Sequence, residues 1–112
     1  MAFPENDHRN FNRDGQQFNV GETFAGLPFE KGVELADALK AFVPAGLTLG
    51  DLALRWCLDF DAVSVIIPGA KNPDQARANA RASSLAPLGA ALHAKLAEFY
   101  TREVAAHIRG AY

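Results

Sequence analysis

Residues 68–79 combine the residue types and spacing of an anion site at the start of a helix. Gly69 and Ala70 are small enough to let a phosphate approach the backbone, and Lys71 adds a positive charge directly before the helix-capping residue Asn72. Unpaired backbone N–H groups and the helix dipole favour negative charge at such a position. A solvent-facing lysine beside an ordinary capped helix explains the same spacing, so both interpretations stay open at this point.

Four helices and one strand are predicted around this motif. Pro28 suits a first helical position, and apolar residues then recur every three or four positions until Pro44. Thr48 with Asp51 forms a capping box for a second, largely apolar helix that we expect to be mostly buried. Asn72 caps the third helix, with Pro73 in its first turn and Gln75 at its third position. An apolar stripe from Leu88 to Ile108 predicts one long final helix, on which Glu98 and Arg102 are spaced to pair.

The β-branched run Val63–Ile67 predicts a strand of the buried, parallel type. Such a strand needs neighbours on both edges, and no other segment of the sequence has strand character. A helix, a strand, a loop and a further helix form one repeat of an alternating α/β architecture, of which a barrel of about 250 residues is a typical whole. We therefore expect an α/β chain, mostly helical with one strand, corresponding to about the last third of a (β/α)8 barrel. In this division residues 1–27 form a long loop, and 28–112 run helix, helix, strand, helix, helix.

Composition excludes several classes of protein. The chain has 112 residues, 49% of them hydrophobic, and a formal net charge of −2 with mixed signs, which disfavours nucleic-acid binding. No apolar run approaches the roughly 18 residues of a membrane span, and the first ten residues lack the pattern of a secretory signal. The single cysteine, Cys57, precludes an internal disulfide and fits a cytoplasmic location.

Other chemistry-bearing side chains are interpreted as structural. His8, His93 and His107 are too scattered for a metal site, and no cysteine or carboxylate completes a ligand set. Cys57 lies on an apolar helix face, where a packed thiol is the ordinary state, and Trp56 is read first as a core side chain. No metal is predicted.

Leu54-Arg55-Trp56, followed by residues 64–79 (SVIIPGAKNPDQARAN), closely resembles the C-terminal signature of the aldo/keto reductase family. The stretch from Asp7 to Gly26 is similar to the long loop that follows the seventh barrel strand in bacterial members. The resemblance implies an NADP(H)-dependent oxidoreductase that reduces aldehydes or ketones. It also implies that this chain is the C-terminal part of the barrel, where the loop after the eighth strand receives the 2′-phosphate and adenine of the cofactor.

Carried over by position, the resemblance implies five cofactor-binding residues. Gly69, Ala70 and Lys71 would line the phosphate pocket through backbone N–H groups and the ammonium, while Gln75 and Asn79 would lie along the adenine. The family commonly has glutamate before that asparagine, where this chain has alanine, which weakens the adenine assignment more than the phosphate one. A second cation beside the phosphate, as in some members, would require the arginine one turn into the helix to swing toward the ribose.

No segment matches the family's catalytic tetrad of aspartate, tyrosine, lysine and histidine. Tyr100 and Tyr112 fall in or after the predicted last helix and are not credible acids for carbonyl reduction. We therefore predict no catalytic residue in this chain and no activity from the chain alone, its cofactor and carbonyl substrate being bound in the complete barrel. The alternative is a non-catalytic helical module derived from the same fold, which would use its unpaired strand and the apolar faces around Trp56 and Phe42 to bind a partner or to self-associate.

Overall fold

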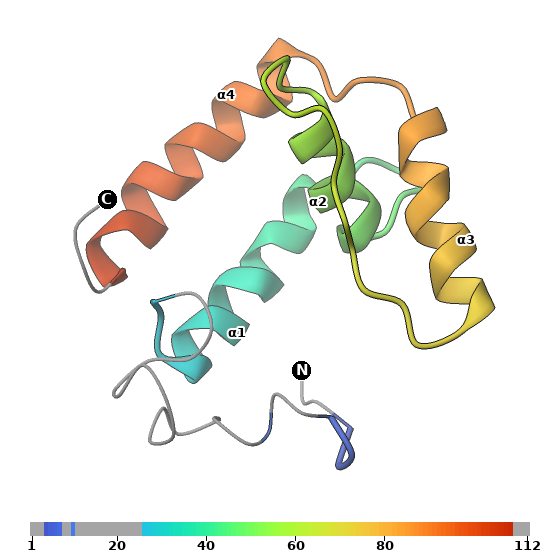
Figure 1. The fold of residues 1–112 in the computed structure, drawn as a ribbon. Helices are drawn as coiled ribbons and strands as arrows, with labels where there is room; N and C mark the ends of the chain where they lie inside the picture. Colours follow the sequence, from blue (N-terminus) through green and yellow to red (C-terminus); the bar gives the residue numbers. More distant parts are fainter. Residues whose placement is uncertain (1–3, 8–9, 11–25, 109–112) are drawn as a thin grey trace. The chain divides into compact units, whose positions relative to one another are not determined.

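The computed structural model describes residues 4–7, 10 and 26–108, and it divides the chain into two compact units. One unit comprises Met1–Ala41 and Ala97–Tyr112, and the other comprises Phe42–Leu96. Figure 1 shows the helices in chain order. The long loop predicted over residues 1–27 lies largely outside the described residues.

The first unit contains α1 (Phe29–Leu39), which continues into a 3₁₀ turn, Lys40–Phe42, whose last residue already belongs to the second unit. Pro28 precedes the helix with φ −55° and ψ 141°, so it occupies the capping position and not the predicted first helical one. Leu35 is the buried side chain of α1, 6% exposed. The predicted helix is therefore confirmed, with its last turn tightened before Pro44.

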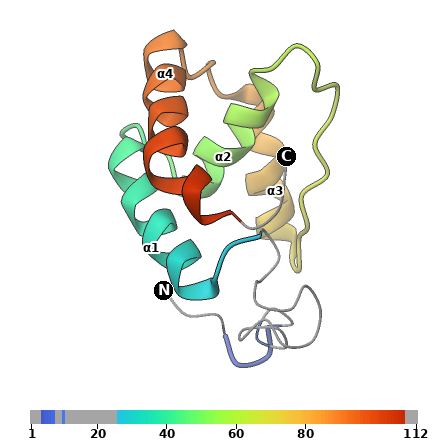
Figure 2. The ribbon, with the colours of Figure 1, turned by 90° about the vertical axis from the view of Figure 1, so that its left-hand side faces the viewer.

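The second unit is built on α2 (Leu49–Leu58) and α3 (Pro73–Arg81), which is followed by a 3₁₀ turn, Ala82–Ser84. α2 contacts both α3 and this turn, and Figures 1 and 2 show α2 and α3 as neighbours in both views. The core lies at their junction, where Leu52 is 3% and Ala82 0% exposed. The prediction that α2 is mostly buried holds only in part, because Trp56 in its last turn remains 40% exposed; Phe60, which the prediction also placed on this helix, lies just after it and is 43% exposed.

The predicted long final helix is shorter and less regular than its apolar stripe suggests. Gly89 has φ +82°, and α4 begins after it as Ala90–Phe99. A π-helical turn, Tyr100–Val104, and a 3₁₀ turn, Ala105–His107, follow. The Thr101 hydroxyl donates to the carbonyl of Ala97 at 3.0 Å and so competes for an acceptor of the regular helix where the turn widens. None of the helices in the described ranges is long and apolar enough to cross a membrane.

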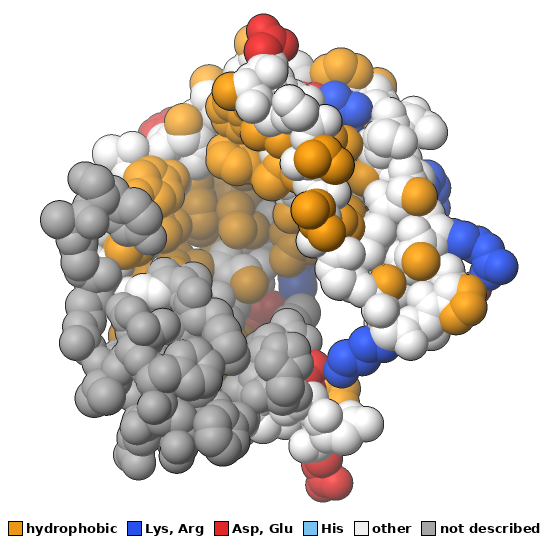
Figure 3. Space-filling view, in the orientation of Figure 1, with side chains coloured by type: hydrophobic (Ala, Val, Ile, Leu, Met, Phe, Trp, Pro, Cys, Tyr) orange, Lys and Arg blue, Asp and Glu red, His pale blue; other side chains and the backbone are white. Residues whose placement is uncertain are grey.

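The predicted strand Val63–Ile67 is wrong for this structure. No strand occurs among the described residues, and the segment from Val63 to Ala70 has no regular secondary structure. A β-branched run becomes a strand only by pairing with a neighbour, and the described part of the chain supplies none. Val65 is 69% and Ile67 92% exposed. Figure 3 shows hydrophobic side chains at the surface on the side of the molecule that Figure 1 also views.

Candidate functional site

The loop before α3 enters the helix as the sequence predicts. Asn72 has extended backbone angles, φ −150° and ψ 165°, and its side-chain oxygen accepts a hydrogen bond from the Gln75 N–H at 2.9 Å. Pro73 occupies the first turn, where its missing N–H costs nothing. Asp74 adds an acidic side chain to the same turn. The N-terminus of α3 is therefore a capped helix start, reached directly from the Gly-Ala-Lys run.

Two amide side chains of α3 hold this run against the helix. The Lys71 N–H donates to Gln75 Oε1 at 2.6 Å, and Asn79 Nδ2 donates to the Gly69 carbonyl at 3.0 Å. Gln75 and Asn79 are one helical turn apart, so their side chains share a face of α3. These two bonds join four of the five residues predicted from the family pattern, and the fifth, Ala70, lies between Gly69 and Lys71 in the sequence.

The site is open to solvent. Residues 67–78 are exposed and Asn79 is half-buried. A β-carbon added at Gly69 would meet nothing within 4 Å, so the described residues leave room for one beside this glycine. An incoming group can reach the loop backbone without displacing a side chain at this position.

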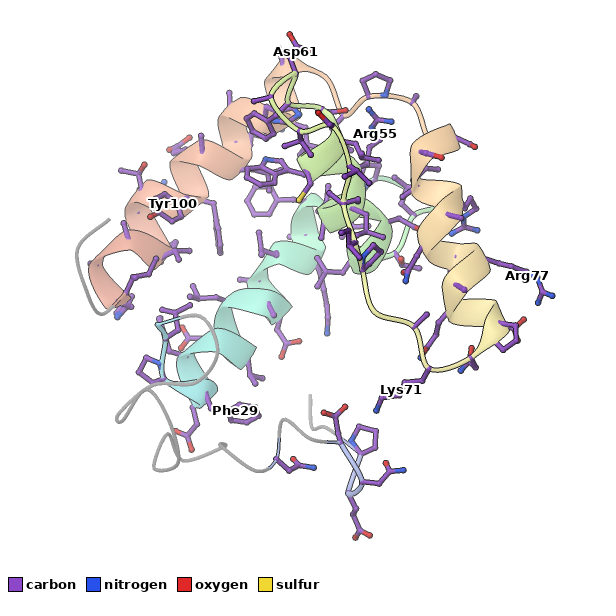
Figure 4. All side chains as sticks on the ribbon, viewed as in Figure 1. Phe29, Arg55, Asp61, Lys71, Arg77 and Tyr100 are labelled. Carbon is purple, nitrogen blue, oxygen red and sulfur yellow. The ribbon has the colours of Figure 1, made fainter. Side chains whose placement is uncertain are left out.

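The cations of this region serve different roles. Arg77 pairs with Asp74 at 3.0 Å on the surface, and Figure 4 shows its side chain directed away from that of Lys71. Arg81 Nη2 lies 2.8 Å from Asp51 Oδ2 on α2 and so joins α3 to the neighbouring helix. The structure therefore offers Lys71, and not a pair of converging cations, as the charge carried by the loop itself.

Asp51 is buried at the N-terminal end of α2, 4% exposed. It completes the predicted capping box: its N–H donates to Thr48 Oγ1 at 3.0 Å, and its carboxylate accepts from the Thr48 N–H at 2.9 Å. The hydrogen bond from the Thr48 backbone lowers the pKa of Asp51, burial opposes this, and Arg81 lowers it further. The capping box predicted from sequence is confirmed, and its link to Arg81 is an addition from the structure.

A second buried carboxylate, Asp59, lies at the other end of α2 and was missed by sequence reasoning. Its side chain is 7% exposed and accepts from Arg55 Nε at 2.8 Å and from the Leu88 N–H at 2.9 Å. His93 Nε2 lies 2.7 Å from the same carboxylate and carries the shared proton, because an ionised carboxylate can only accept. Burial alone would raise the pKa of Asp59, but the bonds from these three partners lower it to about 2.

Aromatic rings and a carbonyl complete this cluster. Trp56 and Phe60 meet edge to face with ring centroids 4.7 Å apart, and the His93 ring stacks on Trp56 at 6.5 Å. Arg55 also donates to the Leu85 carbonyl at 3.2 Å. Arg55 and Asp59 are four residues apart, a spacing that predicts an ion pair on one face of a helix. Nothing in the sequence around Leu85, Leu88 or His93 indicates that they contact this pair. The cluster fixes the start of α4 to the end of α2.

In chemical terms the two parts of the unit differ. The Asp59 carboxylate accepts from three partners and joins α2 to a later part of the chain, whereas the loop at residues 68–72 lies exposed at a helix N-terminus and carries a lysine, and an anion is stabilised at such a position. Such a loop can hold and orient a phosphate.

The sequence profile of the Aldo/keto reductase family matches residues 2–101, and the chain belongs to this family. The family resemblance inferred from residues 54–56 and 64–79 is therefore confirmed. Family membership implies an oxidoreductase built on the TIM barrel, of which this mostly helical chain is a fragment. No curated protein and no solved structure matches the chain.

Proposed function

We propose that this chain is the C-terminal, cofactor-phosphate-binding part of an NADP(H)-dependent aldo/keto reductase that converts aldehydes or ketones to alcohols. The cofactor supplies the hydride, and the protein supplies placement and electrostatics. In this assignment Gly69, Ala70 and Lys71 receive the 2′-phosphate, and the catalytic acid and its partners belong to parts of the barrel that this chain does not contain. The chain alone is then inactive as a carbonyl reductase.

The observation that carries the proposal is the loop at residues 68–72. It is exposed, it carries a lysine, and it enters the N-terminus of α3 through a capped start, all within a chain that belongs to the family. The helix dipole and the lysine charge favour the same ligand group, a phosphate. The empty space beside Gly69 supports the approach of that group to the backbone.

Lys71 provides the test, because only NADP(H) carries the additional 2′-phosphate. Replacing Lys71 with alanine removes a charge-assisted contact, and we expect the affinity of the chain for NADP⁺ to fall about tenfold to hundredfold. The affinity for NAD⁺ should barely change. Lys95, an exposed lysine on α4, gives the matched control, and Lys95→Ala should leave both affinities at the wild-type value. A small and equal effect of Lys71→Ala on the two cofactors would remove the phosphate assignment.

A second candidate function rests on the exposed apolar segment. Val65 and Ile67 are more exposed than is usual for β-branched residues, and Trp56 and Phe60 are also partly exposed. These side chains suit a surface that pairs with another protein or with a second copy of the chain. If they drive self-association, the double variant Val65→Thr, Ile67→Thr should lower the average mass measured by light scattering. A wild-type chain that stays monomeric throughout its concentration range would exclude this mode.

A further inference from the structure

The Gly69–Ala70 peptide has a fixed direction relative to α3. Asn79 Nδ2 donates to the Gly69 carbonyl at 3.0 Å, which turns this carbonyl toward the helix. The described residues contain no cis peptide bond. In a planar trans peptide the C=O and the following N–H point in opposite directions. The Ala70 N–H therefore points away from Asn79 and from α3.

The next peptide is turned the other way. The Lys71 N–H donates to Gln75 Oε1 at 2.6 Å, so this N–H points toward α3 and already has an acceptor. By the same planarity, the Ala70 carbonyl points outward. Two side chains of α3 thus set the directions of two successive backbone N–H groups of the loop. Asn79 turns the Ala70 N–H outward, and Gln75 holds the Lys71 N–H inward.

We propose that Asn79 is a positioning residue that acts through the Gly69–Ala70 peptide and presents the Ala70 N–H to the ligand's phosphate. This inference rests on the function proposed above and refines it. The family pattern assigns Asn79 to the adenine and treats the N–H groups of Gly69, Ala70 and Lys71 alike. The structure instead assigns Asn79 to the shape of the loop and singles out Ala70 as the donor, while Gln75 holds the N–H of Lys71.

The chemistry of the two amides fits this division. A carboxamide has both a donor and an acceptor, and here Asn79 uses its donor on a carbonyl while Gln75 uses its acceptor on an N–H. Ala70 is an exposed residue, so a phosphomonoester can approach the N–H that this peptide turns outward. The Lys71 ammonium then adds charge to a geometry that Asn79 fixes.

The first arm of the experiment uses the ¹⁵N-labelled, unliganded chain. The Lys71 amide proton should exchange with solvent more slowly than the Ala70 amide proton, because the first is held by Gln75 and the second is turned outward. In Asn79→Ala this order should weaken, since the Gly69–Ala70 peptide becomes free to rotate. Faster exchange at Lys71 than at Ala70 in the wild-type chain would overturn the inferred orientation, whatever the ligand is.

The second arm titrates the same chain with adenosine 2′-phosphate and with adenosine. Adenosine 2′-phosphate should shift the Ala70 amide resonance more than that of Lys71. Asn79→Ala should lower the affinity for adenosine 2′-phosphate about tenfold, the loss of one oriented donor to a charged group, and leave the affinity for adenosine unchanged. Asn79→Asp should be at least as damaging, because a carboxylate would face the Gly69 carbonyl. Ser83→Ala, which removes another exposed side-chain bond to a backbone carbonyl, is the matched control and should bind as the wild type does.

The outcomes separate this inference from the proposed function. If adenosine 2′-phosphate shifts no amide of residues 68–72 in the wild-type chain, the phosphate site and this inference both fail. If the wild type binds it and Asn79→Ala binds it equally well, only the inference fails. An equal loss of adenosine and adenosine 2′-phosphate in Asn79→Ala would show that Asn79 holds the base and would also overturn the positioning role.

Discussion

The two ends of α2 and the loop before α3 use polar groups in opposite ways. At the ends of α2, Asp51 is buried and the side chain of Asp59 is 7% exposed, and each joins this helix to a later part of the chain. The loop at residues 68–72 is exposed, and the side chains that shape it come from α3, directly after it in sequence. Long-range contacts to buried carboxylates therefore set the helix packing, and short-range contacts leave the loop backbone accessible to a ligand.

The largest effect should follow removal of the Asp59 carboxylate. Asp59→Ala leaves Arg55, the Leu88 N–H and His93 without their shared acceptor, and breaking a largely buried charged cluster of this kind costs about 3 kcal/mol in the free energy of unfolding. Urea denaturation of the wild type and of Asp59→Ala measures this loss of unfolding free energy. Asp61→Ala, two residues along and exposed, is the control and should stay within about 0.5 kcal/mol of wild type. Equal stability of the two variants would show that the Asp59 cluster does not hold α4 to α2.

The pH dependence of stability should show the same carboxylate. The pKa of Asp59 falls from 3.8 to about 2 on folding, so between these values the unfolded chain binds more protons than the folded one. This contribution, about 2 kcal/mol, is complete well above pH 3.8 and is lost as the pH falls toward 2. Comparing the free energy of unfolding of wild type and Asp59→Asn across this range isolates it. Parallel curves for the two proteins would mean that Asp59 has no depressed pKa.

Arg81 and Arg77 give a smaller and internally matched contrast on one helix. Arg81→Ala removes the partner of buried Asp51 and should cost about 1.5 kcal/mol of unfolding free energy, the lower end for a hydrogen bond to a charged group because Arg81 is 57% exposed. Arg77 pairs with Asp74 where both side chains are exposed, 76% and 94%, so Arg77→Ala should change stability by less than about 0.5 kcal/mol. If Arg81→Ala costs no more stability than Arg77→Ala, the ion pair between Asp51 and Arg81 is not formed in solution.

Gly69→Ala should have the smallest effect on stability and still affect the ligand. Gly69 does not have a positive φ, and an added β-carbon meets nothing within 4 Å, so stability should change by no more than about 0.5 kcal/mol. The added methyl group occupies the space through which a phosphate would approach, so NADP⁺ affinity should fall while NAD⁺ affinity is retained. Unchanged affinity for NADP⁺ would place the phosphate elsewhere.

Local signals in the sequence predicted the parts of the structure that local interactions determine. The starts of α2 and α3 follow from Thr48 with Asp51 and from Asn72 with Gln75, pairs three residues apart whose bonds close within one turn. The gathering of Gly69, Lys71, Gln75 and Asn79 is equally local, because these residues lie in the loop directly before α3 and in the first two turns of that helix. Their contacts with the cofactor stay a prediction.

The failures have the opposite origin. Val63–Ile67 has the composition of a strand, yet a strand exists only when another segment pairs with it, and the described residues contain none. The Asp59 cluster depends on Leu88 and His93, 29 and 34 residues further along the chain. An apolar stripe also cannot show that Gly89 delays the start of α4 or that Thr101 competes for a carbonyl near its end. In each case the interaction or backbone conformation that determines the structure is not part of the sequence pattern on which the prediction was based.

The most direct test of the central claim is calorimetric titration of the unmodified chain with NADP⁺ and with NAD⁺ in the same low-salt buffer. The two cofactors differ by the 2′-phosphate alone, so the ratio of their affinities measures what the loop at residues 68–72 contributes. We predict that NADP⁺ binds at least about tenfold more tightly, as expected for charge-assisted hydrogen bonds to one phosphate. Equal affinities for the two cofactors would contradict the assignment of this loop as the cofactor-phosphate site.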